Sequence, residues 1–188
     1  FDISRTGGNG YMDRNEREST SMAFSILSDL TADLSHTLAL EYQEDQEDSP
    51  YWGSPLLKPV GDSMKIDKDR RFENYNVADG RYEQRVHWLR SILDYQLSDS
   101  TSVQNTLYHY NAQRDYRNVE RYSYTANGKV QRSSPYLQSH DQNLLGDRIE
   151  LRHDNTLFGF ASQWSLGLEY SRMRQTLYPT SSSWSDVV

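Results

Sequence analysis

Apolar and polar residues alternate along this chain with a period of two, over several long stretches. In residues 21–29, Met22, Phe24 and Ile26 alternate with small or polar residues. The same pattern returns in residues 34–43, 87–97, 145–152 and 164–171. Successive side chains of an extended strand point to opposite faces, so each stretch predicts a strand with one apolar face. No stretch sustains a helical period, and we therefore predict an all-β, antiparallel meander of long strands.

Short and long connections alternate between these strands. Polar turns of a few residues follow the strands at 21–29 and 87–97, and such turns join adjacent strands as tight hairpins. We predict long loops over about residues 44–83 and 117–141, which are rich in Pro, Gly, Asp and Asn or in Arg, Ser and Tyr. Ordered loops of this length usually carry function. Residues 1–188 form a single region in this interpretation.

Composition excludes several classes of protein. Only 35% of the residues are hydrophobic and the mean hydropathy is -0.90, but 14 tyrosines argue against a disordered chain. The net charge of -7 would repel phosphate backbones, so no nucleic-acid partner is expected. No run approaches the roughly 20 apolar residues of a membrane-spanning helix. The absence of cysteine excludes disulfides and thiolate metal sites within this sequence.

Strand length, a continuous polar face and the positions of aromatic residues favour a β-barrel in a bacterial outer membrane. The predicted strands have about 10 to 15 residues, whereas soluble strands average nearer 5 or 6. Tyrosine and tryptophan recur near predicted strand ends, as in the aromatic girdles of such barrels. These aromatic residues are Tyr42, Tyr51, Trp52, Tyr95, Tyr108, Tyr110, Trp164, Tyr170 and Tyr178. Alternation alone fits a soluble β-sandwich equally well.

Several segments resemble the barrel of TonB-dependent siderophore receptors. They are "LTADLSHTLALEYQEDQEDSPYWGSPL", "ENYNVADG" with the strands that follow it, "GKVQRSS…HDQNLLGDRIEL" and "FGFASQWSLGLEYSR". The likeness spans nearly the whole chain as a diffuse pattern. It implies a barrel of about 22 strands with an N-terminal plug domain, which takes up ferric siderophores.

The resemblance also implies the partners and the location. They are a ferric siderophore, outer-membrane lipid and lipopolysaccharide, and TonB through receptor parts that this sequence lacks. No resident cofactor is implied, because iron is carried only as the ferric siderophore. Since the sequence supplies roughly six full strands, no plug domain and ends that look cut, we expect an internal segment of the barrel.

Two alternatives remain at this stage. A small complete outer-membrane barrel of about eight strands, acting as an adhesin or structural protein, would fit within 188 residues. A soluble all-β module could instead bind glycans by stacking loop Tyr and Trp residues on sugars. The cut ends disfavour the first alternative, and the polar second faces of the strands disfavour the second.

No motif predicts an enzyme. The five histidines lack metal-ligand spacing, and no nucleophile elbow or phosphate-binding loop occurs. Ligand binding is better supported, because Tyr and Trp offer stacking area and Arg offers charge-assisted hydrogen bonds to chelating oxygens. The candidate ligand-binding residues in the two long loops are Tyr51, Trp52, Arg70, Arg71, Tyr75, Arg117, Arg121, Tyr122, Tyr124 and Arg132.

Overall fold

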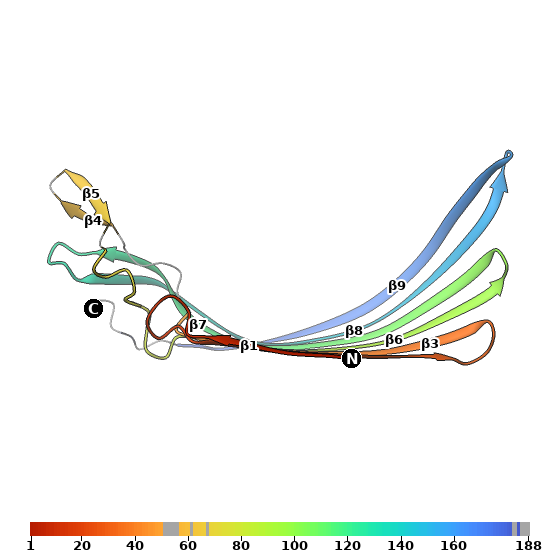
Figure 1. The fold of residues 1–188 in the computed structure, drawn as a ribbon, viewed down its shortest axis with the longest axis horizontal. Helices are drawn as coiled ribbons and strands as arrows, with labels where there is room; N and C mark the ends of the chain where they lie inside the picture. Colours follow the sequence, from red (N-terminus) through yellow and green to blue (C-terminus); the bar gives the residue numbers. More distant parts are fainter. Residues whose placement is uncertain (51–56, 61, 67, 182–183, 185–188) are drawn as a thin grey trace.

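The computed structural model describes residues 1–50, 57–60, 62–66, 68–181 and 184. Seven strands form one antiparallel sheet in the order β1-β2-β3-β6-β7-β8-β9 (Figure 1). They are β1 (Asp2–Gly8), β2 (Arg17–Asp29), β3 (Leu34–Asp48), β6 (Arg81–Ser98), β7 (Thr101–Tyr124), β8 (Val130–Leu157) and β9 (Phe160–Tyr178). A separate two-stranded sheet pairs β4 (Leu57–Val60) with β5 (Ser63–Ile66). The predicted all-β antiparallel meander of long strands is confirmed.

The sheet is curved like a bowl, and its two ends differ (Figure 1). At one end, short turns join β2 to β3, β6 to β7 and β8 to β9; we call this the hairpin end. The last of these turns contains Phe158 and Gly159, both with positive φ, a conformation that suits the twist of a two-residue hairpin. The opposite end carries the connections 9–16, 49–80 and 125–129, and we call it the loop end.

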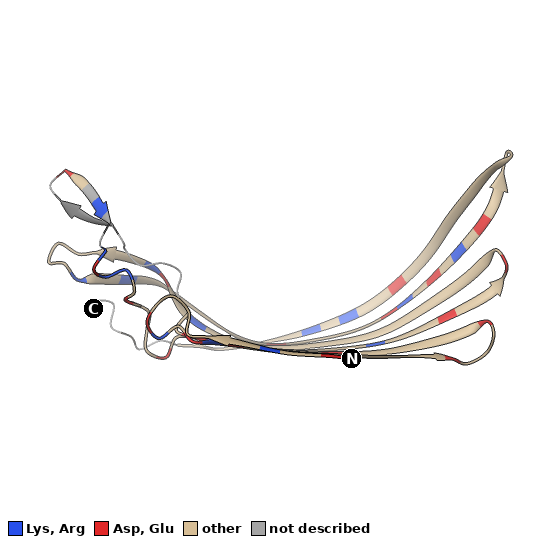
Figure 2. Cartoon of the chain, viewed as in Figure 1, with Lys and Arg blue, Asp and Glu red and all other residues tan. Residues whose placement is uncertain are grey.

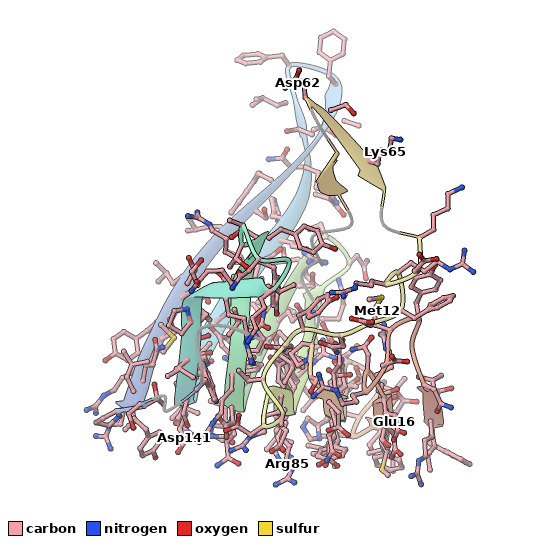
Figure 3. All side chains as sticks on the ribbon, turned by 90° about the vertical axis from the view of Figure 1, so that its left-hand side faces the viewer. Met12, Glu16, Asp62, Lys65, Arg85 and Asp141 are labelled. Carbon is pink, nitrogen blue, oxygen red and sulfur yellow. The ribbon has the colours of Figure 1, made fainter. Side chains whose placement is uncertain are left out.

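The convex face of the sheet is apolar over its middle. Register pairs Phe24 with Leu40 and Leu40 with Leu89, so the apolar stripes of successive strands join into one belt. In Figure 3, Arg85 and Asp141 point away from the underside of the bowl, and they share this face with Leu89 and Leu145. The belt has no second layer over it among the described residues. Its exposed members are Met22, Phe24, Ile26, Leu40, Leu89, Leu93, Leu107, Leu145, Ile149, Leu166 and Leu168.

The concave face is polar and its side chains bond to one another across the strands. Glu41 forms an ion pair with Arg90. The Gln104 amide donates to Asp94 at 2.7 Å, and Tyr108 donates to Glu169 at 2.5 Å. The sheet therefore separates an apolar surface from a hydrogen-bonded polar surface, as the alternation predicts.

The boundaries of the two predicted loops are wrong. The first was expected over 44–83, but β3 continues to Asp48 and β6 begins at Arg81. The second was expected over 117–141, but β7 and β8 stay paired throughout and turn only at 125–129. The extensions of β7 and β8 carry isolated apolar residues such as Val119 and Val130 and aromatic residues such as Tyr116, but they lack the regular alternation by which the rest of the sheet was predicted.

Two of the predicted girdle tyrosines are misplaced as well. Tyr108 and Tyr110 lie in the middle of β7, opposite Arg90 and Trp88 of β6. They therefore face the concave side rather than the border of the apolar belt. Tyr51 and Trp52 lie outside the described residues.

Gly146 has no side chain because Tyr108 crosses over it. A Cβ atom at Gly146 would lie 2.2 Å from the Tyr108 ring, too close for any real contact. This passage lets the Tyr108 hydroxyl reach across β8 to Glu169 on β9. Gly167 lies on the same face of β9, but its nearest neighbour would be a backbone oxygen at 3.6 Å.

We expect Gly146→Ala to lower the free energy of unfolding by about 1–3 kcal/mol, because the Tyr108 ring must leave its position. Gly167→Ala is the matched control and should stay within about 0.5 kcal/mol of the parent. Denaturant unfolding of the full-length protein in lipid vesicles measures both. In a Tyr108→Ala background, Gly146→Ala should lower the free energy of unfolding much less than it does in the parent. An equal loss of unfolding free energy in both backgrounds would contradict this account.

Candidate ligand-binding site

A cleft opens on each face of the sheet near the loop end. The cleft on the convex face has a volume of about 420 Å³ and the cleft on the concave face about 510 Å³. The concave one, of about 510 Å³, has aromatic walls, and we call it the loop-end cleft. Its place follows from strand parity, because even-numbered residues of β6, β7 and β8 face the concave side. Its lining residues are Glu47, Pro50, Tyr82, Arg114, Tyr116, Glu120, Tyr136 and Gln138.

Three tyrosines from three adjacent strands form one wall of the loop-end cleft. The ring centroids of Tyr82 and Tyr116 are 6.0 Å apart, and those of Tyr116 and Tyr136 are 5.5 Å apart, both edge to face. Such pairs are favourable beyond the area that they bury. Tyr116 is only 8% exposed, whereas Tyr136 is 44% exposed. The wall therefore has a fixed centre and an open edge on which a planar group could stack.

Arg114 is held against this wall by Gln84. Its Nε and Nη2 atoms donate to Gln84 Oε1 at 3.0 and 2.6 Å, and the Tyr82 hydroxyl donates to the same oxygen at 3.0 Å. The guanidinium carbon also lies 5.6 Å from the centre of the Tyr82 ring, within cation–π range. One amide oxygen thus orients both the cation and the aromatic ring.

His140 lies directly opposite Arg114, on β8. Its side chain is buried, and burial together with the nearby Arg114 charge lowers the pKa of His140 below its usual value of 6.5. The lowered pKa favours the neutral imidazole, and His140 is not among the described residues that line the cleft.

A buried asparagine network ties the 49–80 connection to β7 beside the cleft. Asn76 Nδ2 donates to Asn118 Oδ1 at 2.9 Å and to the Pro50 carbonyl at 2.6 Å. Asn76 Oδ1 accepts from the backbone amides of Val77 and Val119. Both asparagines are buried, Asn118 completely. Buried amides are costly unless bonded, so this network fixes how the connection sits on the sheet.

The asparagine network extends to both the cleft and the first connection. Asn118 Nδ2 donates to the Tyr116 hydroxyl at 2.8 Å, which links it to the aromatic wall. Asn74 Nδ2 donates to the Ser49 carbonyl, and Arg14 donates to the Asn74 carbonyl at 2.5 Å. The 9–16 connection, the 49–80 connection and strand β7 are thereby joined at the loop end.

The candidates from the 44–83 region lie apart from the cleft. Arg70 and Tyr75 contact one another at 3.5 Å, and Tyr75 donates to Glu73 at 2.5 Å. Burial and the Glu73 carboxylate raise the pKa of Tyr75 to about 12, with Arg70 opposing. The Arg71 guanidinium stacks 4.6 Å above the Phe72 ring. Tyr51 and Trp52 fall outside the described residues.

The candidates from the 117–141 region lie on the paired extensions of β7 and β8. Arg117 forms ion pairs with Asp79 at 3.6 Å and Asp115 at 3.8 Å. Tyr122 lies opposite Arg132 in the register, which brings those two together. Arg121 and Tyr124 belong to the same end of β7. None of the eight candidates that the structure describes lines the loop-end cleft.

The prediction missed the tyrosines and Arg114 because they belong to strands rather than loops. The available signal was parity: in "RYEQRV" and "NAQRDYRN", aromatic and basic residues continue the concave-facing positions of the strand. Beyond the apolar belt, such residues face the space enclosed by the sheet. Counting alternate positions outward from the belt would have found Tyr82, Arg114 and Tyr116.

A polar band borders the apolar belt on the convex face. Arg85 and Glu44 form an ion pair at 2.7 Å, and the Tyr42 hydroxyl donates to the same carboxylate. These contacts lower the pKa of Glu44, with Arg85 the main cause. Further along, Tyr178 donates to Asp141 at 2.7 Å. Figure 2 shows Lys, Arg, Asp and Glu along the strands and in the connections at the loop end.

Neither a metal site nor a spanning helix is found in the described part of the chain. No three His, Asp or Glu residues there come close enough together to hold a metal ion. The same residues include no helix long and apolar enough to cross a membrane.

We expect Asn76→Ala to release the 49–80 connection without unfolding the sheet. The substitution removes the partner that Asn76 supplies to the Val77 and Val119 amides and to Asn118 Oδ1, a local cost of roughly 3 kcal/mol or more. Hydrogen exchange of residues 74–80 and 118–119 should accelerate, while exchange in β2 and β3 stays unchanged. Asn155→Ala, at an exposed position of β8, is the control. Equal exchange in both variants would show that the network does not hold the connection.

The fold of this chain is similar to parts of solved receptor structures. No protein-family profile and no curated protein matches the sequence. Among solved structures, the ferric-catecholate import receptor Fiu from E. coli K12 matches 99% of the chain, with TM-scores of 0.79 (open form) and 0.78 (closed form) at 16% identity. BauA, the ferric preacinetobactin receptor from Acinetobacter baumannii, matches 97% of it with a TM-score of 0.74 at 12% identity.

The chain spans less than a third of these receptors, between 27% and 31% of their length. All three structures are of receptors. At this level of identity the likeness concerns the fold. The chain has the fold of a segment of a receptor β-barrel, as its sequence predicts.

Proposed function

We propose that this chain forms part of the barrel wall of an outer-membrane receptor for TonB-dependent uptake of a ferric siderophore. The observation that carries the proposal is the match of nearly the whole chain to a ferric-catecholate import receptor with a TM-score of 0.79. The low identity leaves the cargo to be argued from the residues of the chain itself.

The two faces of the sheet support a membrane location. The convex belt exposes Phe24, Leu40, Leu145 and Leu168 with no covering layer among the described residues, as a lipid-facing surface would. In a bilayer the backbone groups of these strands must all be paired, which a continuous antiparallel ladder achieves. The charged band at Glu44 and Arg85 would then meet the headgroups, including lipopolysaccharide.

The loop-end cleft supports ligand capture on the concave side. In the proposed orientation it opens where the barrel lumen meets the outside, and its tyrosine wall offers stacking area. The siderophore supplies every ligand to the iron, so iron is cargo and the chain needs no metal site of its own. TonB would act through parts of the receptor outside this chain.

An adhesin or structural role as a small closed barrel has less support. The described strands run from β1 to β9 without pairing those two to each other, so the sheet does not close. A soluble glycan-binding module would leave the convex belt in water, which is unfavourable for so many large apolar side chains.

The test is iron uptake by cells that produce the full-length protein. Deleting its gene should abolish accumulation of radioactive iron supplied as the cognate ferric siderophore, and a plasmid copy should restore it. Dissipating the proton-motive force should stop uptake but spare surface binding, because transport needs TonB-coupled energy. If deletion leaves uptake and binding unchanged for a broad panel of ferric siderophores, the proposed function is wrong.

A further inference from the structure

The charges that line the loop-end cleft indicate which ferric complexes can bind in it. This inference rests on the proposed function. Two carboxylates line the cleft, Glu47 from β3 and Glu120 from β7. Glu47 accepts a hydrogen bond from Asn15 at 2.8 Å, which leaves its charge in place. No ion pair between described residues neutralises either carboxylate.

Arg114 is the one basic side chain among the described residues that line the cleft. Two of its guanidinium nitrogens already donate to Gln84, and its face lies over Tyr82. The described lining therefore carries two negative charges against one positive charge, and two of the five N–H donors of that guanidinium already bond to Gln84.

Ferric complexes differ strongly in charge. A ferric ion held by three doubly ionised catechols is strongly anionic, whereas one held by three singly ionised hydroxamates is neutral. A pendant ammonium makes a hydroxamate complex cationic. Binding in the cleft removes water, which strengthens both the repulsion of an anion by Glu47 and Glu120 and the attraction of a cation.

We infer that the loop-end cleft takes neutral or cationic ferric complexes of the hydroxamate class and disfavours ferric triscatecholates. The three tyrosines supply stacking area that needs no opposite charge, and Glu47 and Glu120 set the preference. This departs from the catecholate receptor whose fold the chain shares.

The test compares complexes of different charge on the purified full-length receptor. The probes are a trihydroxamate with a pendant ammonium, a neutral cyclic trihydroxamate and a triscatecholate, each as the ferric complex. Affinity should fall in that order. Tighter binding of the triscatecholate would overturn the charge inference alone. Binding of none of the three would overturn the inference together with the proposed function.

Charge-neutralising variants test the assignment to these residues. Glu120→Gln and Glu47→Gln should each weaken binding of the ammonium-bearing trihydroxamate roughly fivefold and should strengthen binding of the triscatecholate. Glu18→Gln is the matched control, because Glu18 lies on the convex face of β2 and pairs with Arg5. If both cleft variants keep the parental ratio of affinities, the cleft does not set the charge preference.

Discussion

The antiparallel hydrogen-bond ladder in a single register is the constraint on which the rest of this structure depends. Because side chains alternate, a slip of one residue between any two strands would send an apolar stripe to the polar face. The pairs Phe24–Leu40, Leu40–Leu89 and Leu151–Leu166 keep the stripes together across the sheet. On the other face, the Glu41–Arg90 ion pair and the bond from Tyr108 to Glu169 favour the same register.

The same ladder also positions the loop-end cleft. β7 and β8 continue well past the apolar belt, and their concave positions there carry Tyr116, Arg114 and Tyr136 instead of small polar residues. Asn76 and Asn118 then fix the 49–80 connection against these extensions. The cleft is therefore built from strands and a bonded connection, and such a site holds its geometry better than a free loop.

Sequence reasoning predicted the part of the fold in which burial demands a pattern. Met22, Phe24 and Ile26 alternate because one face of β2 is apolar, and that alternation is visible without coordinates. Residues 117–141 mix polar, aromatic and isolated apolar residues without regular alternation, so nothing in their pattern distinguishes a paired strand from a loop. β4 and β5 were likewise included in a predicted loop.

The residues chosen from the sequence and the residues that line the cleft are different sets. The chosen residues were Tyr, Trp and Arg in presumed loops, whereas the cleft is lined by strand residues such as Tyr82, Arg114 and Tyr116. Some of the chosen residues instead contact residues of the 49–80 connection: Arg70 contacts Tyr75, and Tyr75 contacts Glu73. Arg117 of β7 forms an ion pair with Asp79. Which aromatic residues share a cleft depends on pairing between β6, β7 and β8, and that long-range register is not encoded in any single segment.

Spin labels at adjacent positions would test the central claim, that one face of this sheet meets lipid and the other meets water. These 188 residues contain no cysteine, so Phe24→Cys and Ser25→Cys on β2, and Leu166→Cys and Ser165→Cys on β9, can be labelled individually once any cysteine elsewhere in the full-length protein has been replaced. In vesicles containing the full-length protein, labels at 24 and 166 should collide with oxygen dissolved in the bilayer. Labels at 25 and 165 should favour a water-soluble nickel complex or show contact with neither. Strong collision of the labels at 24 and 166 with the nickel complex would contradict the account.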